Sequence, residues 1–584
     1  MKTQFLLCGD IGCVGYGSQE VYQKFQELQA DWFEVRFTGC LGFCAVGPVL
    51  EVNPGKIFYH KVKPADVPEI LETAKNGETL ERLLYKHPET KQPCVRIEEV
   101  PFYQKQKKIV LRTNGQVSPD SIDDYLALGG YDGLRKALTM QPEAIVDEIV
   151  KSGLRGRGGG GFPTGRKWQS VLKAHSDVKY ILCNGDEGDP GAFMDRSVMQ
   201  GTPHVVLEGM IIGAYAIGAH QGFIYVRDEY PQAVAHLQKA IEDARAKNFL
   251  GNNILDSSFN FDITIKRGAG AFVCGESSAL MRSIEGKIGE PNEKYVHASE
   301  QGLWGKPTVL NNVETFANVP YILLHGAEQY KQLGTEKSPG TKVFCLVGKV
   351  KNVGLIEVEM GITLRKVIFD IGGGIVKDRP FKAVQTGGPS GGCIPSQYLD
   401  TPIDFDSLVA LGSMMGSGGM IVMDDCDCMV EVARYFTKFL IEESCGKCAP
   451  CREGLIHLNH LLERITHGKG QPEDLQKLEK LGAYIAESSL CGLGKTAPNP
   501  LLSTLRYFRE EYVDHIKHHH CSAGVCKALT TFMIDQEKCT QCGACVRACP
   551  VSAISQNGNV VIDQEKCITC GECRAVCNFN AVIW

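Results

Sequence analysis

The sequence predicts a multidomain protein of mixed α/β and α+β class. Three observations support this prediction: the chain has 584 residues, its apolar residues switch between helix and strand periods, and its 25 cysteines gather in separate groups. A single hydrophobic core seldom grows beyond about 250 residues, so a chain of this length should divide into several domains. The cysteine groups then indicate what those domains hold.

Charge and hydropathy argue against two classes of partner. The formal net charge is −6, which provides no overall basic surface for nucleic acid. The longest apolar run, VVLEGMIIGAYAIGA from Val205, is too short to span a bilayer and contains Glu208. We therefore expect a buried helix there, and no membrane partner.

The N-terminus, MKTQFLLCGD, has only a short apolar run, whereas a signal peptide needs about 7 to 15 apolar residues. A cytoplasmic location is therefore expected. Because that compartment keeps thiols reduced, grouped cysteines are more often metal ligands or catalytic groups than disulfides.

The first domain, expected over residues 1–95, contains two cysteine pairs. Its pattern predicts a strand (QFLLCG), a helix (SQEVYQKFQELQAD), a strand (FEVRFTG), a hairpin turned at Asn-Pro-Gly and a last helix (DVPEILETAK). This order resembles a thioredoxin-like ferredoxin, and the resemblance implies a [2Fe–2S] cluster held in the loops. A zinc site and simple burial of the thiols are the alternatives. The candidate ligands are Cys8, Cys13, Cys40 and Cys44.

The last domain, expected over residues 530–584, is a tandem repeat. IDQEKCTQCGACVRACPVSAI begins at Ile534 and IDQEKCITCGECRAVCNFNAV at Ile562, and each contains C-x2-C-x2-C-x3-C. With this spacing three cysteines bind one [4Fe–4S] cluster and the fourth crosses to the other cluster. Two structural zinc knuckles are the alternative. The ligands expected for the first cluster are Cys539, Cys542, Cys545 and Cys577, and those for the second are Cys567, Cys570, Cys573 and Cys549.

A third group lies in the domain expected over residues 429–515. ESCGKCAPCREG has three close cysteines, and a fourth follows in SSLCGLG. Between them, GLIHLNHLLERITHG and EDLQKLEKLGAYIAESS have helical periodicity, so a small helical bundle should return the fourth thiolate to the other three. The set suits a [4Fe–4S] cluster, with zinc as the alternative. The candidate ligands are Cys445, Cys448, Cys451 and Cys491.

The remaining cysteines lie outside these groups. Cys521 and Cys526 follow the histidine-rich HIKHHH, and two thiolates with one or two imidazoles can bind zinc. A solvated loop is the alternative. The others are isolated or lie in strand-like surroundings, and we expect most of them to be small core residues. They are Cys94, Cys183, Cys274, Cys345, Cys393, Cys426 and Cys428.

The stretch SGLRGRGGGGFPTGRKW from Ser152 combines glycines with cations. Glycines let backbone N–H groups converge on phosphate oxygens, and Arg157 and Lys167 can neutralise the charge. Iron–sulfur clusters take one electron at a time, whereas a nicotinamide gives up two as hydride, so a flavin between them is expected. The loop does not carry G-x-G-x-x-G between a strand and a helix, so a Rossmann fold is not assumed.

Further stretches accompany this loop: YILCNGDEGDPGAFMDR from Tyr180, GAGAFVCGESSALMRSIEG from Gly268, GLWGKPTVLNNVET from Gly302, and ESCGKCAPCREG. Together they resemble the family of flavin- and NADH-binding (51 kDa-type) subunits of complex I and its soluble relatives. The resemblance covers about residues 110–500. It implies an FMN- and NAD(H)-binding α/β domain over residues 110–338 and reversible hydride transfer without a catalytic acid, base or nucleophile.

The resemblance also implies the residues of the cofactor site. The dinucleotide should stack near Phe162, with Asp189, Lys294 and His297 at the rim. Asp189 stands where a glutamate is common, and Ser277 stands where many relatives have a glutamate that repels a 2′-phosphate. NAD(H) should therefore be used and NADP(H) not firmly excluded. The full set is Gly156, Arg157, Gly158, Phe162, Lys167, Asn184, Asp186, Glu187, Asp189, Gly275, Glu276, Ser277, Lys294, His297, Asn311, Asn312 and Thr315.

The order of domains indicates the complex. By the same resemblance, residues 339–428 form a β-grasp module, and their glycine-rich stretches are expected to be scaffold. Ferredoxin modules fused on both sides resemble the beta subunit of soluble electron-bifurcating and NAD(P)-reducing hydrogenases. This implies a hydrogenase or dehydrogenase catalytic subunit, a small [2Fe–2S] subunit and ferredoxin as partners. The alternatives are the equivalent subunit of a formate dehydrogenase or other bifurcating oxidoreductase, and a complex I subunit.

Overall fold

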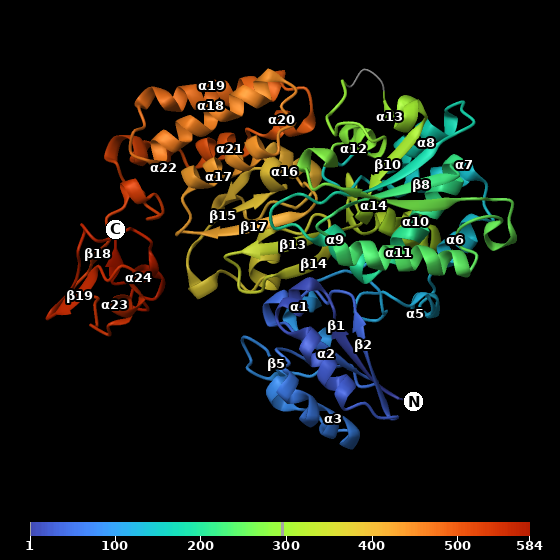
Figure 1. The fold of residues 1–584 in the computed structure, drawn as a ribbon, viewed down its shortest axis with the longest axis horizontal. Helices are drawn as coiled ribbons and strands as arrows, with labels where there is room; N and C mark the ends of the chain where they lie inside the picture. Colours follow the sequence, from blue (N-terminus) through green and yellow to red (C-terminus); the bar gives the residue numbers. More distant parts are fainter. Residues whose placement is uncertain (1, 294–296) are drawn as a thin grey trace. The chain divides into compact units, whose positions relative to one another are not determined.

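The computed structural model describes residues 2–293 and 297–584 and divides into two compact units. Figure 1 labels their elements. No helix in the described ranges is long and apolar enough to cross a membrane. The first unit comprises Met1–Asp378, Val384–Gly388 and Gln397–Val422, and the second comprises Arg379–Ala383, Pro389–Ser396 and Met423–Trp584.

The N-terminal part of the first unit is a four-stranded sheet in the order β2-β1-β3-β4. β1 (Thr3–Cys8) runs parallel to β2 (Phe33–Thr38) and antiparallel to β3 (Leu50–Asn53), which pairs with β4 (Ile57–Tyr59). The predicted order of strands, helices and hairpin is confirmed.

Two longer helices contribute to the core of this part of the molecule (Figure 1). They are α2 (Ser18–Glu27) and α3 (Val67–Asn76). Their apolar faces, including Phe25 and Ile70, pack in one buried cluster with Phe5 of β1. Burial of these faces stabilises the domain and leaves the cysteine loops at the ends of the strands.

The central part of the first unit contains a parallel sheet in the order β10-β7-β8-β9. Parallel strands need crossover connections, and helices supply them here. All four strands therefore end at the same edge, where loops can assemble a binding site. The strands are β7 (Tyr180–Gly185), β8 (Gln221–Arg227), β9 (Asp262–Gly268) and β10 (Thr308–Asn312).

The predicted buried helix is α10 (Pro203–Ile217), in which every residue except Tyr215 is buried. A helix that is apolar on all sides belongs inside a core, and α10 packs against α14 (Val313–His325) and α11 (Pro231–Ala246). Its one carboxylate, Glu208, accepts hydrogen bonds from the Tyr125 hydroxyl and from backbone N–H groups. These bonds compensate the cost of burying the carboxylate.

A smaller sheet follows. β13 (Thr341–Gly348) runs antiparallel to β14 (Gly354–Glu359) and parallel to β17 (Gly419–Asp424). The boundary between the two units falls within β17. After β14 the chain forms a π-helical turn, Lys366–Ile371.

Glu357 in β14 is fully buried and attaches a distant segment to this sheet. Its carboxylate accepts the backbone N–H groups of Ile109, Val110 and Leu111 over 2.8 to 2.9 Å, and the Thr341 hydroxyl. One side chain thereby fixes the segment that leads into the central part of the unit.

The second unit contains a bundle of α17 (Met429–Glu442), α18 (Ala449–Thr466), α19 (Pro472–Ser488) and α21 (Asn499–Tyr507). α18 packs against both α17 and α19. α18 and α19 confirm the two helices predicted from periodicity.

The C-terminal part of the second unit has two small antiparallel strand pairs and two short helices (Figure 1). β19 (Ile554–Asn557) pairs with its neighbour β20 (Asn559–Ile562), whereas β18 (Met533–Ile534) pairs with the last strand, β21 (Val582–Ile583). The first and last strands of the repeat therefore close the domain. Its helices are α23 (Ala544–Ala548) and α24 (Glu572–Ala575).

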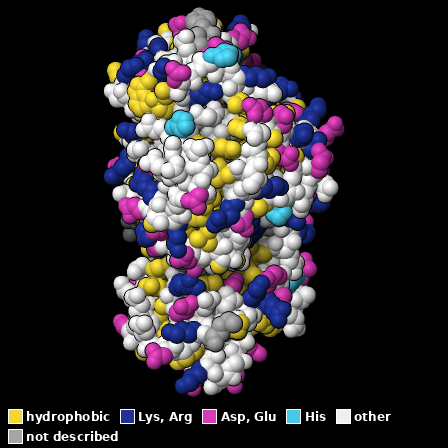
Figure 2. Space-filling model, turned by 90° about the vertical axis from the view of Figure 1, so that its right-hand side faces the viewer, with side chains coloured by type: hydrophobic (Ala, Val, Ile, Leu, Met, Phe, Trp, Pro, Cys, Tyr) yellow, Lys and Arg dark blue, Asp and Glu magenta, His cyan; other side chains and the backbone are white. Residues whose placement is uncertain are grey.

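The charged side chains are mixed on the face drawn in Figure 2. Lys and Arg lie among Asp and Glu there, without a broad area of one sign among the residues in colour. This mixture agrees with the small net charge of −6.

Candidate cofactor and metal sites

The predicted cofactor residues gather at the carboxyl edge of the parallel sheet. Asn184 lies at the end of β7 and Asn312 at the end of β10, and Glu276 lies in the loop after β9. The Asn184 side-chain amide donates to the Gly275 carbonyl over 2.9 Å and accepts the Asp186 N–H over 3.0 Å. Loops that follow two different strands are thus joined at one edge, where open α/β sheets bind ligands.

The glycine loop, residues 153–163, lies directly on the end of β10. A Cβ at Gly158 would stand only 2.9 Å from the Cβ of Asn312, so the close approach needs a glycine. A Cβ at Gly160 would meet nothing within 4 Å. Phe162 beside it is 56% exposed. The loop therefore presents open backbone next to an accessible aromatic ring.

Arg157 differs from the expectation that its guanidinium neutralises a phosphate. The side chain is fully buried, and its guanidinium donates to the carbonyls of Arg155 and Pro339 and to the Tyr330 hydroxyl. Its backbone N–H donates to the Thr315 hydroxyl over 2.9 Å. Because both terminal nitrogens of its guanidinium bond inside the protein, Arg157 supports the glycine loop from the protein interior.

Lys167 is the cation that fits the predicted role. It lies in α8 (Thr164–Lys173), and its one hydrogen bond within the described residues is to the Leu310 carbonyl of β10, over 2.6 Å. Burial lowers its pKa to about 8. A half-buried ammonium with only a carbonyl partner is poorly compensated, and a phosphate would supply the missing negative charge. The open backbone at Gly160 and this ammonium together fit the phosphate of FMN.

Glu187 organises the loop after β7. Its carboxylate accepts the N–H groups of Asp195 and Arg196 over 3.1 and 3.0 Å, at the start of α9 (Met194–Gly201). Free N–H groups and the helix dipole stabilise a carboxylate in this position. The Asn312 amide donates to the Asp195 carboxylate, whose pKa burial raises well above its usual range.

Several predicted residues also cap helices at this edge. Glu276 caps α12 (Ser277–Ile284) and Asn312 caps α14, each by accepting backbone N–H groups. His297 immediately precedes a short helix. The predicted residue Lys294 lies outside the described residues.

The side chain of Asn311 points into the protein interior. Its side-chain oxygen accepts the Trp168 indole N–H over 2.9 Å, and both residues are buried. This bond ties the end of β10 to α8, so Asn311 positions the strand that carries its neighbour Asn312.

Asp189 shows that two glycine-rich loops reach the site. Its carboxylate accepts the Ser417 hydroxyl over 2.5 Å, and burial raises its pKa to about 6. A Cβ at Gly388 would lie 2.4 Å from its Cγ, and Gly416 forms a β-bridge with Gly159. The sequence predicted both loops as scaffold, and their contacts with Asp189 and Gly159 agree with a supporting role beside the predicted site. Glycine runs mark close backbone approach as well as turns.

The four N-terminal cysteines come together at the ends of strands. Cys8 ends β1, Cys13 lies in α1 (Ile11–Gly15), and Cys40 and Cys44 lie in the loop after β2. The neighbouring thiols of Cys13 and Cys40 lower the pKa of Cys8, and those of Cys44 and Cys8 raise the pKa of Cys40, so the four thiols are near neighbours. One compact set of four sulfurs results.

The bundle cysteines gather at helix starts. Cys448 precedes α18, Cys451 lies in its first turn, and Cys491 precedes α20 (Gly492–Thr496). Burial, together with the neighbouring Cys448, Cys491 and Cys445, raises the pKa of Cys451 to about 11. Four cysteines brought together in this way suit metal binding, because a bound cation would stabilise their thiolates.

The C-terminal cysteines surround two separate small cavities. In each cavity three thiols come from one half of the repeat and the fourth comes from the other half. The first is lined by Cys539, Cys542, Cys545 and Cys577, and the second by Cys549, Cys567, Cys570 and Cys573.

A further buried group consists of Cys428, His515, Cys521 and Cys526, whose donor atoms all lie within 4.8 Å of one another. His515 Nε2 lies 3.3 Å from the sulfurs of Cys428 and Cys526. Its Nδ1 is 2.7 Å from the Glu511 carbonyl, which fixes the ring so that Nε2 faces the thiols. Three cysteines and one histidine suit tetrahedral zinc.

The sequence did not predict the role of Cys428. It was expected to be a core residue, because it lies 87 positions before His515 and no short spacing links them. The start of α17 brings it to the other ligands. Within HIKHHH, His515 is the histidine that faces the site, whereas His518 contacts Asp514.

Comparison with known protein families assigns three regions. Residues 149–321 match the Nuo51 FMN-binding domain, and residues 431–515 match the iron–sulfur binding region of NADH-ubiquinone oxidoreductase-F. Residues 531–578 match a 4Fe–4S dicluster domain. The matched regions contain the glycine loop, the bundle cysteines and the C-terminal repeat.

Individual relatives agree. The chain is 57% identical over 451 residues to the NADP-reducing hydrogenase subunit HndC of Solidesulfovibrio fructosivorans, covering 77% of this chain and 92% of that protein. It is 46% identical over 401 residues to the F 2 subunit of the NADH-quinone oxidoreductase of Rhizobium meliloti (strain 1021), covering 68% and 95%.

Among solved structures, an NAD+-reducing [NiFe]-hydrogenase in its H2-reduced state matches with a TM-score of 0.63 and 28% identity, over 88% of this chain and 84% of that one. The sheet-edge site, the cysteine groups and these similarities agree with one another. The chain belongs to the family of flavin- and NADH-binding (51 kDa-type) subunits of complex I and related hydrogenases, and is an NAD(P)H-oxidising iron–sulfur flavoprotein subunit of a multi-subunit enzyme.

Proposed function

We propose that this chain transfers hydride reversibly between NAD(H) and FMN at the carboxyl edge of the parallel sheet, and passes the electrons singly to partner subunits through its clusters. The observation that carries the proposal is Lys167, a half-buried ammonium bonded to the strand that the glycine loop contacts, with no counter-ion among the described residues bonded to it.

When bound, FMN accepts the two electrons of a hydride and releases them one at a time. The protein binds FMN and the nicotinamide and orients them. Lys167 and the backbone around Gly158 would hold the phosphate, and Asn184 and Glu187 would fix the loop beside the ring system. Phe162 and Asp189 would line the nicotinamide side. Holding the two rings in contact is the main contribution of these residues, since no side chain need take or give a proton.

We assign one [2Fe–2S] cluster to the N-terminal cysteines, and three [4Fe–4S] clusters to the bundle group and the two C-terminal cavities. We assign zinc to the group of Cys428, His515, Cys521 and Cys526. The close sets of four sulfurs support the cluster assignments. Mössbauer spectra of the purified holoprotein would distinguish them from zinc at the same cysteines.

For the complex, we favour an electron-bifurcating hydrogenase that couples NADH, ferredoxin and H2. The relative at 57% identity is a hydrogenase subunit. The NADH-quinone oxidoreductase relative from Rhizobium meliloti is covered over 95% of its length by only 68% of this chain, which leaves ferredoxin modules as additions here. Purification with bound partner subunits tests this: a catalytic formate dehydrogenase subunit, or membrane subunits of complex I, would favour those alternatives.

Ser277 bears on the choice of nicotinamide. It is the first residue of α12 and adds no carboxylate next to Glu276. A carboxylate there would repel a 2′-phosphate, so we propose that NADPH is also accepted. Replacing Ser277 by glutamate should raise the KM for NADPH while leaving that for NADH nearly unchanged. Strict NADH preference in the unchanged protein would contradict the proposal.

The central test is anaerobic addition of NADH to the reconstituted full-length protein. Loss of flavin absorbance, followed by EPR signals of reduced clusters, is expected. Failure to retain FMN, together with failure to reduce a one-electron dye with either nicotinamide, would overturn the proposed function.

A further inference from the structure

Helix α9 links the loop after β7, which contains Glu187, to the N-terminal cysteine loops within the first unit. Its first N–H groups bind the Glu187 carboxylate, and its last residue, Gly201, lies against Gly39 beside Cys40. The helix has 8 residues, which gives a length of about 12 Å at 1.5 Å per residue. One short rigid element therefore has the two predicted redox sites at its two ends.

Asp10 makes the polar contact between the cysteine loop of residues 8–13 and this helix. Its Oδ2 accepts the Ser197 hydroxyl over 3.1 Å, and its Oδ1 accepts from Arg196 Nη2 over 3.3 Å. The same Oδ1 accepts the Gly12 N–H over 3.2 Å and caps α1. Asp10 is 4% exposed and Ser197 is fully buried. A single carboxylate thus orders the cysteine loop and attaches it to α9.

The second cysteine loop meets the other end of α9 through backbone alone. A Cβ at Gly39 would lie 2.6 Å from the Cα of Gly201, so this approach depends on two glycines. The Asn114 amide donates to the Cys40 carbonyl over 3.1 Å and holds the loop in place.

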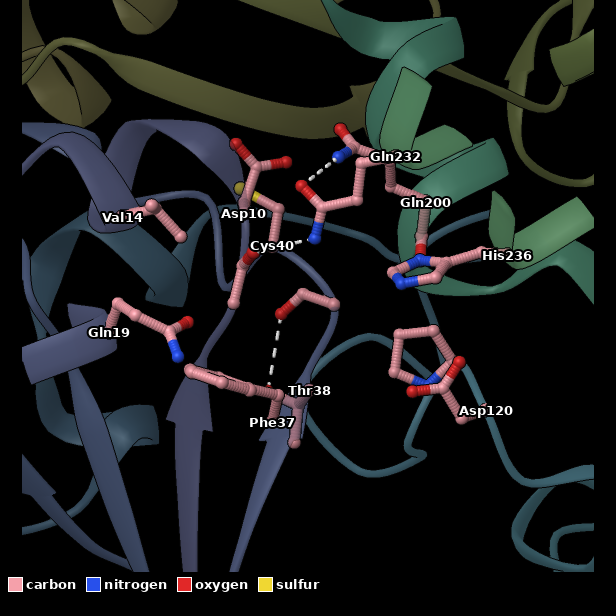
Figure 3. A pocket seen from close by; sticks show the side chains of 13 residues that line it. Asp10, Val14, Gln19, Phe37, Thr38, Cys40, Asp120, Gln200, Gln232 and His236 are labelled. Atoms are coloured by element: carbon pink, nitrogen blue, oxygen red, sulfur yellow. Dashed lines mark hydrogen bonds between the residues drawn. The ribbon is translucent and has the colours of Figure 1, made fainter. Parts of the chain in front are cut away.

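A cavity of about 160 Å³ lies beside these contacts. Figure 3 shows Asp10 and Cys40 on one side of it, and Gln200, Gln232 and His236 from the flavin-binding part on the other. Interdigitated side chains normally fix the separation of two surfaces. Because a cavity replaces such packing here, the position of the 8–13 loop depends on a few polar contacts. These are the bonds made by Asp10 and one bond from the Gln232 side chain to the Gly9 carbonyl over 3.3 Å.

We propose that Asp10 is a positioning residue. Through Ser197 and Arg196 it holds the N-terminal cluster at a fixed separation from the flavin, and it thereby sets how fast that cluster is reduced. The inference rests on the proposed function. In this step one electron leaves the reduced flavin, one ferric ion of the cluster becomes ferrous, and no covalent bond changes.

The test uses the reconstituted full-length protein, mixed with NADH and freeze-quenched for EPR of the reduced [2Fe–2S] cluster. In Asp10→Ala and Ser197→Ala, reduction of this cluster should slow by about tenfold or more, since a misplacement of about 1 Å can cost up to about 10²-fold in rate. NADH-dependent reduction of a dye at the flavin, and the cluster signal obtained with dithionite, should not change. Asp10→Asn retains an acceptor for Ser197 and should recover most of the rate.

The matched control is Asp120→Asn, an exposed carboxylate that lines the same cavity. In this variant NADH should reduce the N-terminal cluster at the unchanged rate. Hydrogen exchange of residues 9–15, measured without NADH, should be faster in both Asp10→Ala and Ser197→Ala but not in the control. If Asp10→Ala loses its cluster, Ser197→Ala decides, because it leaves the cysteine loop intact.

Two failures can be told apart. If NADH does not reduce the flavin in the unchanged protein, the proposed function is wrong. If the flavin is reduced and Ser197→Ala reduces the N-terminal cluster at the unchanged rate, the role assigned to Asp10 is wrong.

Discussion

At the scale of single residues, Lys167 connects an electrostatic property to cofactor binding. Its pKa, lowered to about 8 by burial, means that the ammonium is present at neutral pH and is lost as the pH rises above 8. We expect FMN affinity of the apoprotein to fall over that range. Lys167→Met should weaken binding at pH 7 by about tenfold or more, because a charge-assisted hydrogen bond contributes about 1.5 to 3 kcal/mol. Fluorescence titration of FMN measures both effects.

The control for this prediction is Lys167→Arg, which stays protonated throughout. Its FMN affinity should not decline between pH 7 and pH 9.5, apart from any constant offset. An equal decline in Lys167→Arg and the unchanged protein would show that another group titrates.

From the buried carboxyl of Asp189 we expect the thermal stability of the protein to depend on pH. Burial raises its pKa from 3.8 to about 6, so the folded state favours the protonated acid. The stabilisation of the folded state by the protonated Asp189 carboxyl is fully present below pH 3.8. It is lost as the pH rises through 6. Asp189→Asn keeps an acceptor for Ser417 without ionising. By calorimetry without nicotinamide, its thermal midpoint should exceed that of the unchanged protein at pH 7.5, and the difference should vanish below pH 4.

The exposed Asp177 provides the comparison. Asp177→Asn should leave the midpoint unchanged at both pH values, since an exposed carboxylate gains nothing from neutralisation. A constant difference for Asp189→Asn at every pH would mean that the amide acts through packing instead.

Site residues could be predicted from the sequence where they lie close to one another along the chain. The cysteines in C-x2-C-x2-C loops were found because neighbours in sequence are neighbours in space. Cys428 was missed because only the packing of α17 brings it to His515. Arg157 was assigned to phosphate from its position in the loop, but the direction of its side chain is set by Tyr330 and Pro339, which sequence could not place.

At the scale of elements, Glu357 attaches residues 109–111 to the β13–β14 sheet. In Glu357→Ala, three backbone N–H groups would lose their acceptor inside the protein. Each buried unsatisfied group costs about 1 to 3 kcal/mol. We therefore expect a markedly lower urea midpoint and faster proteolysis near residues 105–117.

The matched substitution is Glu359→Ala, two positions along the same strand, where the side chain is exposed. It should resist urea and protease like the unchanged protein. Equal sensitivity of the two variants would show that the strand itself, and not the carboxylate, holds the segment.

Elements were predicted well where periodicity is strong. The helices α10, α18 and α19 and the strands of the N-terminal sheet follow directly from hydrophobic spacing. The loops around Gly388 and Ser417 have no such period, and their approach to Asp189 results from the tertiary fold.

At the scale of the whole molecule, the zinc assignment joins segments that are far apart in the chain. Cys428→Ser removes one ligand, and metal analysis should show the loss of about one zinc per chain, because structural zinc needs all four ligands. Thermal stability of the second unit should fall with it, since zinc binding contributes directly to folding.

Cys393→Ser is the control, because Cys393 is also a fully buried cysteine of the second unit but lies outside this group. It should retain its zinc. Equal metal content in Cys428→Ser and the unchanged protein would contradict the assignment.

The exchange of Cys549 and Cys577 between the two C-terminal cavities makes each half of the repeat incomplete without the other. Either half alone would lack one of the four cysteines that line its cavity. Oxidative injury to one crossing thiol would also disturb an inorganic centre on the opposite side of the module. The two halves of the repeat are therefore expected to function only together.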